Sequence, residues 1–211
     1  MQSLDRASEA DEAEPGPSVR TPSSQTALIG RDSQLVWLRE VYLAALNKGP
    51  RIVTLAGAGG IGKTRLIDAF LAPPGRDGGP GPRVLRGRAR SQGLSYGVFA
   101  RLLRSRFEIA EPTDTETAKV NLRRHVASVL EDRKVSDVCF FLAQLMDLPF
   151  DESPLTRAVA DDPLQARILR RAVVKSFFEK DSAIGPLCLV FEDLHIADED
   201  SIDLLGYLLA N

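Results

Sequence analysis

The sequence predicts an α/β fold in which helices flank a mostly parallel sheet. Three observations carry this prediction: an apolar run before a glycine-rich loop (51–56), an apolar run that ends in two carboxylates (187–193), and long helical patterns between them. Short β-branched or apolar runs of this kind are typical of strands buried on both faces of a parallel sheet. A further strand is predicted at 83–90, and the long helical stretch at 91–184 forms an insert without an evident chemical role.

The glycine-rich loop matches the phosphate-binding pattern G-x-x-x-x-G-K-[ST] at every fixed position. In order, its residues are Gly57, Ala58, Gly59, Gly60, Ile61, Gly62, Lys63 and Thr64. The backbone N–H groups of such a loop, at the positive end of the next helix, bind phosphate oxygens, and its glycines allow turns and close approach. We expect Lys63 to reach the terminal phosphates of ATP as a catalytic cation and the Thr64 hydroxyl to ligate Mg²⁺.

The flanks of the loop support this interpretation. Residues 51–56 form the apolar run before it, and residues 64–71 repeat apolar side chains at helical spacing until Pro73 and Pro74 end the pattern. A glycine-rich turn between two core elements is the alternative, and the strand–loop–helix context argues against it.

A second motif follows far along the chain. The apolar run 187–191 is succeeded by Glu192 and Asp193. A buried parallel strand delivers the residues that follow it to the carboxyl edge of the sheet, where α/β proteins bind ligands. The two carboxylates therefore have the form of a Walker B motif, and each motif makes the other more specific.

Composition bounds the remaining function classes. With 211 residues, 44% hydrophobic and 27% charged, the chain has room for one domain (27–211) after a polar, acidic leader (1–26) that is expected to be disordered. The net charge of −2 gives no general attraction to nucleic acid or to acidic membranes. Cys139 and Cys188 lie in apolar runs, so no disulfide is expected. The leader lacks the apolar core of a secretory signal, and no run is long enough to span a bilayer, so we expect a cytoplasmic protein.

The segment before the loop carries a family resemblance. Ile29, Gly30, Arg31 and Leu35 fit the pattern h-h-G-R-x-x-x-L, which resembles the first segment of AAA+ P-loop ATPases, specifically the origin-recognition-complex-like modules of STAND signalling proteins. The pair Tyr96-Gly97 and the stretch 194–198 are also similar to that family. The resemblance implies that Ile29, Gly30 and Arg31 contact the base and ribose. The alternative for Arg31 is a solvated residue at the start of a helix.

The resemblance also assigns roles to the two carboxylates. Glu192 matches the Mg²⁺-associated acid, and Asp193 matches the residue that orients or deprotonates the attacking water. This order departs from the more common Asp-Glu pair, and Asp has the shorter reach, so ATP binding is expected with hydrolysis in doubt. His195 either senses the terminal phosphate or caps a turn.

The function expected from these motifs is a Mg·ATP-binding module whose ATP hydrolysis is coupled to signalling or transcriptional regulation. Three functions remain open: this ATPase, an ATP/ADP switch with negligible turnover as the first alternative, and a nucleic-acid-binding regulator. Only a basic ladder supports the third function; it consists of Arg86, Arg88 and Arg90 on one face of the strand 83–90. Such charges also protect an edge strand from aggregation, and for this reason nucleic acid is not the expected partner.

The resemblance further implies a strand that follows the Walker B unit and inserts beside the strand of the phosphate loop. No residue after Asn211 can supply that strand. We therefore expect a fragment with missing C-terminal strands and exposed strand edges, which tends to associate with itself or with protein partners. The complete protein would be an ATPase, whereas the fragment is expected to bind ATP weakly at best, with little or no hydrolysis.

Helix expectations complete the prediction. A first helix places Leu35, Leu38, Tyr42 and Leu46 on one face, capped by Asp32 or Ser33. Further helices are expected at 115–134, at 137–148, after an Asp162 cap with Pro163 in the first position, and at 198–209 with Ile202, Leu205 and Leu208 inward. His125 is expected to be structural, because no second metal ligand lies at helical spacing.

Overall fold

Two parallel strands form the sheet of the structure, a computed structural model that describes residues 29–72, 81–91, 94–130, 132–159 and 161–210. Strand β1 (Arg83–Arg88) pairs with strand β2 (Leu187–Glu192) so that Arg83 lies opposite Leu187 and Arg88 lies opposite Glu192. Both strands confirm predicted ones. The leader 1–26 and residues 73–80, where the predicted helix after the glycine-rich loop ends, lie outside the described residues.

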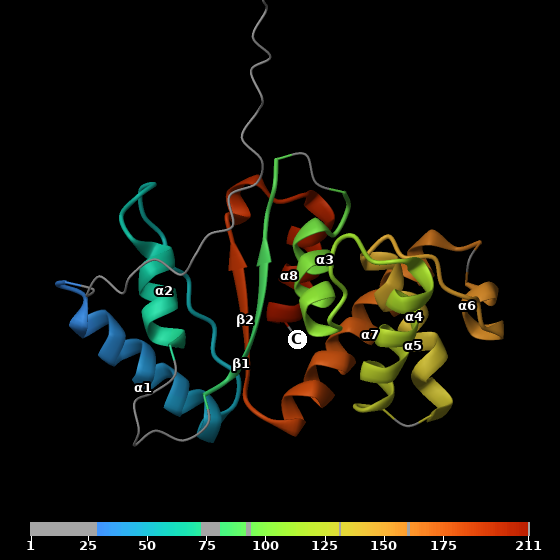
Figure 1. Cartoon of the computed structure of the whole chain (residues 1–211), viewed down its shortest axis with the longest axis horizontal. Helices are drawn as coiled ribbons and strands as arrows, with labels where there is room; N and C mark the ends of the chain where they lie inside the picture. The colour runs from blue at the N-terminus through green and yellow to red at the C-terminus, as the bar shows by residue number, and fades with distance from the viewer. Residues whose placement is uncertain (1–28, 73–80, 92–93, 131, 160, 211) are drawn as a thin grey trace, which may run out of the picture.

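Helices lie on both sides of the strand pair. They are α1 (Asp32–Lys48), α2 (Lys63–Leu71), α3 (Gly97–Arg106), α4 (Thr115–Ala127), α5 (Asp132–Leu145), α6 (Pro154–Ala158), α7 (Pro163–Ile184), the short 3₁₀ helix η1 (Leu194–Ile196) and α8 (Glu199–Ala210). Figure 1 shows α1 and α2 on one side of the strands and the α-helices from α3 to α8 on the other. Within the described part of the chain, no helix combines the length and apolar character needed to cross a bilayer.

The predicted strand at 51–56 is wrong. These residues have no strand assignment, and the Ile52 side chain is 62% exposed. A strand exists only through ladder hydrogen bonds to a neighbour, and in the described residues β2 has no strand partner besides β1. The apolar run 51–56 therefore has the composition of a buried strand, but among the described residues it has no neighbouring strand with which to pair.

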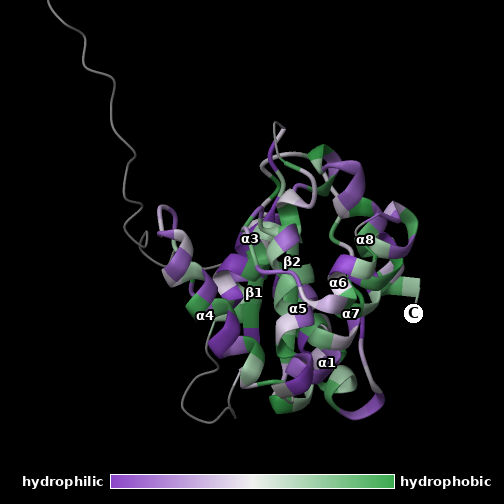
Figure 2. Cartoon of the chain, turned by 90° about the vertical axis from the view of Figure 1, so that its right-hand side faces the viewer, coloured by the Kyte–Doolittle hydropathy of each residue, from purple (hydrophilic) through white to green (hydrophobic). Residues whose placement is uncertain are grey.

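The core lies between the sheet and the helices α3, α4, α5, α7 and α8. Phe99 from α3 and Phe177 from α7 are almost completely buried, and each contributes about 1.5–3 kcal/mol through burial. Figure 2 shows β2 almost entirely in the hydrophobic colour, which fits a strand that packs against this core. The helical insert is thus continuous with the core that supports β1 and β2.

The helix predictions need boundary corrections. The predicted helix 115–134 is two helices, because α4 ends at Ala127 and a turn precedes α5. Leu130 occupies that turn and is buried there, its N–H bonded to the Val126 carbonyl. The predicted helix 137–148 begins earlier and ends at Leu145, where Asp147 takes a left-handed conformation with φ of 51°.

Capping distinguishes a confirmed start from a wrong one. The Asp162 carboxylate accepts hydrogen bonds from the N–H groups of Leu164 and Gln165, and Pro163 is the first residue of α7, as predicted. In α1 the N-cap position falls on Arg31 instead of Asp32 or Ser33, and no side chain caps the helix.

Two inward-facing predictions are also wrong. Leu46 of α1 and Ile202 of α8 are exposed, whereas Leu38 and Leu204 are buried. In α8 the buried face passes through Ser201 and Leu204, so Ile202 lies on the outer side. His125 is half-buried, with Nδ1 3.2 Å from an Arg106 nitrogen, which agrees with a structural role.

Both cysteines are free thiols. Cys139 is buried in the core, and this burial raises the pKa of its thiol to about 12. A thiol with such a pKa is not reactive near neutral pH.

Candidate functional site

The phosphate-binding loop has the backbone of an anion site. Gly57, Gly60 and Gly62 have positive φ values of 155°, 77° and 92°, in a region that favours glycine. Gly62 forms the N-cap of α2 in a left-handed conformation, which starts the helix directly at Lys63. Gly59 is different: its φ is outside that region and a Cβ there would meet no atom within 4 Å, so neither backbone conformation nor packing requires glycine at this position.

Lys63 lies across this loop. Its Nζ donates hydrogen bonds to the carbonyl oxygens of Gly57 and Ala58, at 2.8 and 2.9 Å. Thr64 follows in the first turn of α2 with an exposed side chain. The first turn of α2 contains no acidic residue, so the positive end of the helix faces the loop uncompensated.

A hollow of about 230 Å³ opens beside the loop between α1 and α2. Its lining residues are Arg31, Gln34, Thr54, Leu55, Ala56, Ile61, Gly62, Lys63 and Leu66. The Arg31 guanidinium donates to the Ile61 carbonyl at 3.2 Å, which ties the start of α1 to the phosphate loop. Of the predicted base-contacting residues, Arg31 therefore lines the hollow, whereas Ile29 (91% exposed) and Gly30 are not in its lining.

Sequence reasoning missed Gln34 and Thr54 in this hollow. Gln34 lies three residues after Arg31, the N-cap residue of α1, and both side chains line the hollow at the start of this helix. The three-residue spacing from Arg31 was the sequence feature that could have identified Gln34 as a further residue of the site.

The two carboxylates follow β2, but their surroundings differ. Glu192 is half-buried, and its Oε1 atom is buried without a hydrogen-bond partner in the described part of the chain. A buried carboxylate oxygen that lacks a donor is costly unless a cation binds it. The described residues contain no group of three or more His, Cys, Asp or Glu side chains that could hold a metal ion by themselves. Mg²⁺ does not require such a group, because it is usually bound by one or two carboxylates together with substrate phosphates. A single carboxylate such as Glu192 therefore fits Mg²⁺ bound together with a nucleotide.

Asp193 is held by a side chain from the neighbouring strand. Its Oδ2 lies 2.7 Å from the Nε of Arg88, and Asp193 itself has a left-handed φ of 55°. The hydrogen bond and negative charge of Asp193, with a smaller contribution from Glu192, raise the pKa of Arg88. One oxygen of the predicted catalytic acid is thus already engaged by a cation.

The predicted basic ladder is largely neutralised inside the protein. Arg88 pairs with Asp193, and Arg86 pairs with Asp68 of α2. Because β1 has a strand neighbour only on one side among the described residues, the ladder belongs to an edge strand. These pairs favour the edge-strand interpretation over nucleic-acid contact.

Both motifs lie toward the same end of the molecule. In Figure 1 the start of α2 and the carboxyl ends of β1 and β2 are all toward the top. This is the edge at which α/β sheets bind ligands. His195 lies just beyond β2 in η1, with an exposed side chain.

Asp198, the last residue of the stretch that follows β2, was not predicted as a site residue. Its carboxylate accepts hydrogen bonds from the N–H groups of Tyr96, Gly97 and Ser201 and from the Ser201 hydroxyl, at 2.8–3.0 Å. Burial alone raises the pKa of Asp198, but the hydrogen bonds from Ser201, Tyr96 and Gly97 outweigh it and lower the pKa below its usual range. Asp198 therefore caps the first turns of both α3 and α8.

Comparison with known proteins gives one match. A family model for the AAA ATPase domain matches residues 27–211, which includes the phosphate loop, Arg31 and both carboxylates. No curated protein and no solved structure matches the chain. The family implies a P-loop nucleotide site that binds ATP, in agreement with the loop, the helix start and the carboxylates described above. The chain belongs to the AAA ATPase domain family.

Proposed function

We propose that the chain is an ATP-binding switch module of the origin-recognition-complex-like, STAND type, in which nucleotide binding matters more than turnover. The resemblance of residues 29–35 and 194–198 to that group supports the subtype and, with it, a role in cytoplasmic signalling or transcriptional regulation. The net charge and the paired arginines of β1 argue against nucleic acid as the partner.

In this proposal the phosphate loop binds the phosphates of ATP. The N–H groups of residues 57–64 and the Lys63 ammonium supply the positive field, and Lys63 exchanges its two carbonyl partners for phosphate oxygens. Arg31 and Gln34 line the hollow beside the loop, where the nucleoside end would lie, with Ile29 and Gly30 next to it in the chain.

Thr64 and Glu192 are the residues that would hold Mg²⁺. The unpaired Oε1 of Glu192 is the observation that fits a cation there. When bound, the metal would neutralise the developing negative charge of the phosphates. Every other step falls to groups of this chain: Lys63 binds the terminal phosphate, and Asp193 accepts a proton from the attacking water.

The ion pair between Arg88 and Asp193 is the observation that carries the switch proposal. It occupies an oxygen of Asp193 that would otherwise be available to orient water. The two side chains are 59% and 39% exposed, and an exposed pair contributes only about 0–1 kcal/mol, so opening it is inexpensive. The closed pair therefore slows hydrolysis by at most about fivefold. It adds to the shorter reach of Asp193, to which general-base chemistry is sensitive, and both features favour slow turnover.

The experiment compares binding with turnover in the same sample. Equilibrium titration with ATP and Mg²⁺ measures binding, and phosphate release measures hydrolysis. The switch proposal expects clear binding with slow release. Hydrolysis at about 1–10³ s⁻¹, the range of ordinary enzymes, would support the full ATPase instead, and absence of binding would reject both.

A further inference from the structure

Asp198 joins the loop after β2 to the start of the helical region. Its Oδ1 accepts from the N–H groups of Tyr96 and Ser201, and its Oδ2 accepts from the N–H of Gly97 and the Ser201 hydroxyl. Ser201 is buried, and its Oγ is also 3.4 Å from the Val98 N–H. The end of the loop 193–198 at Asp198 therefore cannot shift relative to α3 without breaking these hydrogen bonds.

The loop 193–198 and the start of α3, which Asp198 joins, each contain a residue with an unfavourable backbone conformation. Tyr96 and Asp193 have left-handed φ values of 61° and 55°, which are unfavourable for residues with a Cβ. Each such residue costs on the order of 1 kcal/mol and persists only when its surroundings hold it. Arg88 holds Asp193, and Asp198 holds Tyr96.

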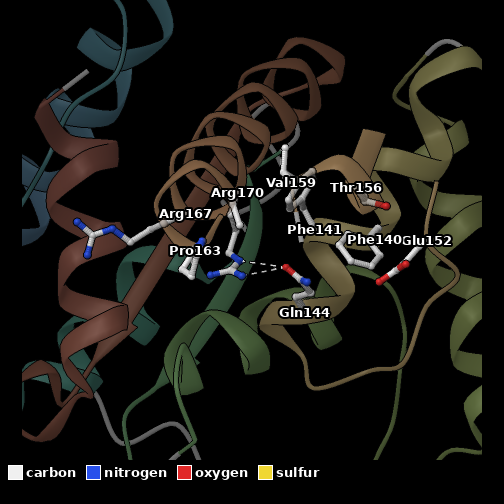
Figure 3. Close-up of a pocket in the computed structure, with 10 residues that line it drawn as sticks. Phe140, Phe141, Gln144, Glu152, Thr156, Val159, Pro163, Arg167 and Arg170 are labelled. Carbon is white, nitrogen blue, oxygen red and sulfur yellow. Dashed lines mark hydrogen bonds between the residues drawn. The ribbon is translucent and has the colours of Figure 1, made fainter. Parts of the chain in front are cut away.

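Tyr96 extends the connection into the helical insert. Its hydroxyl accepts a hydrogen bond from Arg170 of α7 at 3.0 Å, and the Arg170 guanidinium lies 5.3 Å from the centre of its ring. Arg170 also donates to the Gln144 amide oxygen of α5, as Figure 3 shows. These two residues line a hollow of about 360 Å³ between α5, α6 and α7.

We propose that Asp198 is a positioning residue that couples the loop of the second carboxylate to α3, and through Tyr96 and Arg170 to α7. The inference rests on the proposed nucleotide switch. It identifies the region of α5 to α7 as the part of the molecule that responds to the bound nucleotide. When ATP draws Asp193 away from Arg88, the loop 193–198 moves, and Asp198 carries that movement to Tyr96. Because coupling is reciprocal, a change at Tyr96 also alters how the site distinguishes ATP from ADP.

Hydrogen exchange of the full chain tests this proposal. Wild type with Mg·ATP is compared with wild type with Mg·ADP, and amide exchange is followed at the start of α3 (95–98) and the start of α7 (163–172). Both segments are expected to exchange at different rates in the two states. In Asp198→Asn both differences vanish, and the ratio of ATP to ADP affinity changes by about fivefold or more, the lower bound of ordinary allosteric coupling. Asp200→Asn, the same substitution two residues later, is the control, and it is expected to keep both exchange differences and the wild-type affinity ratio.

A merely structural role for Asp198 would lower stability without changing the affinity ratio or the exchange difference. Tyr96→Phe provides the second arm, because it removes only the hydroxyl that Arg170 contacts. In this variant the difference at α3 persists and the difference at α7 is lost, so the test survives if Asp198→Asn does not fold. If wild type binds no ATP, the proposed function fails and the coupling falls with it. If wild type binds ATP and both variants keep wild-type exchange differences and affinity ratio, only the coupling is rejected.

Discussion

At the scale of single residues, the proposed switch depends on the ion pair between the Arg88 guanidinium and the Asp193 carboxylate. The pair is largely exposed, so it lowers the population of free Asp193 by at most about fivefold, which corresponds to about 1 kcal/mol. We expect Arg88→Ala to raise ATP turnover by about this factor. Phosphate release at saturating ATP is the measurement, and Arg90→Ala, an exposed arginine on the same predicted face, is the control. Lower turnover in Arg88→Ala would show instead that Arg88 assists the reaction.

The two carboxylates after β2 should separate binding from chemistry. Glu192 has a buried oxygen without a donor, whereas an oxygen of Asp193 pairs with Arg88. We expect Glu192→Gln to weaken the Mg²⁺ dependence of ATP affinity, because it removes the carboxylate that we propose as a metal ligand. Asp193→Asn is expected to lower turnover more than affinity, since a general acid–base group typically contributes about 10²–10⁴-fold. Paired titration and turnover assays decide, and the opposite pattern would exchange the two roles.

The sequence was most informative where a motif defines its own geometry. The backbone of the loop 57–62 and the helix start at Lys63 agree with the prediction, because glycine conformation and the following helix are local properties. Among the four glycines of this loop, Gly59 alone lacks the expected conformation. The partners of Asp193 and Asp198 could not be predicted. Arg88 is 105 positions before Asp193, and Tyr96 is 102 before Asp198, so only the folded chain brings each pair together.

At the scale of secondary-structure elements, β1 and α3 meet at a position that has no room for a side chain. A Cβ on Gly87 would lie 2.3 Å from the Val98 carbonyl oxygen, which is backbone and cannot turn away. We expect Gly87→Ala to destabilise the protein by about 1–3 kcal/mol, as overpacking does. Urea unfolding measures the effect. Gly206→Ala is the matched control: it lies in α8 with no atom within 4 Å of its Cβ, and alanine is the better helix former by about 1 kcal/mol. Equal stability of wild type and Gly87→Ala would contradict the described packing.

Element existence was more predictable than element pairing. The patterns at 83–90 and 187–191 correctly predicted strands, and Asp162 with Pro163 correctly predicted the start of α7. Residues 51–56 have similar apolar composition, yet they form no strand, because a ladder depends on what lies alongside. The split between α4 and α5 was also missed, since Leu130 continues the helical spacing while it is buried in a turn.

At the scale of the whole molecule, two aspartates are expected to make the free energy of unfolding depend on pH in the acidic range. Asp181 is fully buried between Arg83 and Arg106; burial alone raises its pKa, but the hydrogen bonds and charges of both arginines lower it overall. The pKa of Asp198 is lowered by its four hydrogen bonds despite burial. A depressed folded-state pKa adds stability that is present above the unfolded value, near 3.9, and is lost as pH falls through the lower folded value.

The urea concentration at the midpoint of unfolding should therefore be constant at pH values well above 4. It should decrease as the pH is lowered below about 4. Urea titrations at a series of pH values provide the measurement. In Asp198→Asn the fall with acid is expected to be shallower than in wild type, while Asp200→Asn should follow wild type. A wild-type midpoint that rises as pH is lowered from 4 to 3 would reverse the assigned sign.

The central claim is that the loop at 57–64 binds the phosphates of ATP, and Lys63 tests it most directly. The Lys63 ammonium already donates to two loop carbonyls, so it lies where terminal phosphate oxygens would bind. Calorimetric titration of ATP with Mg²⁺ is expected to show binding by wild type and little or none by Lys63→Ala. If the wild-type dissociation constant is about a thousandth of the ATP concentration, the ligand also adds about 4 kcal/mol to the free energy of unfolding. Equal ATP affinity of the two proteins would contradict the assignment.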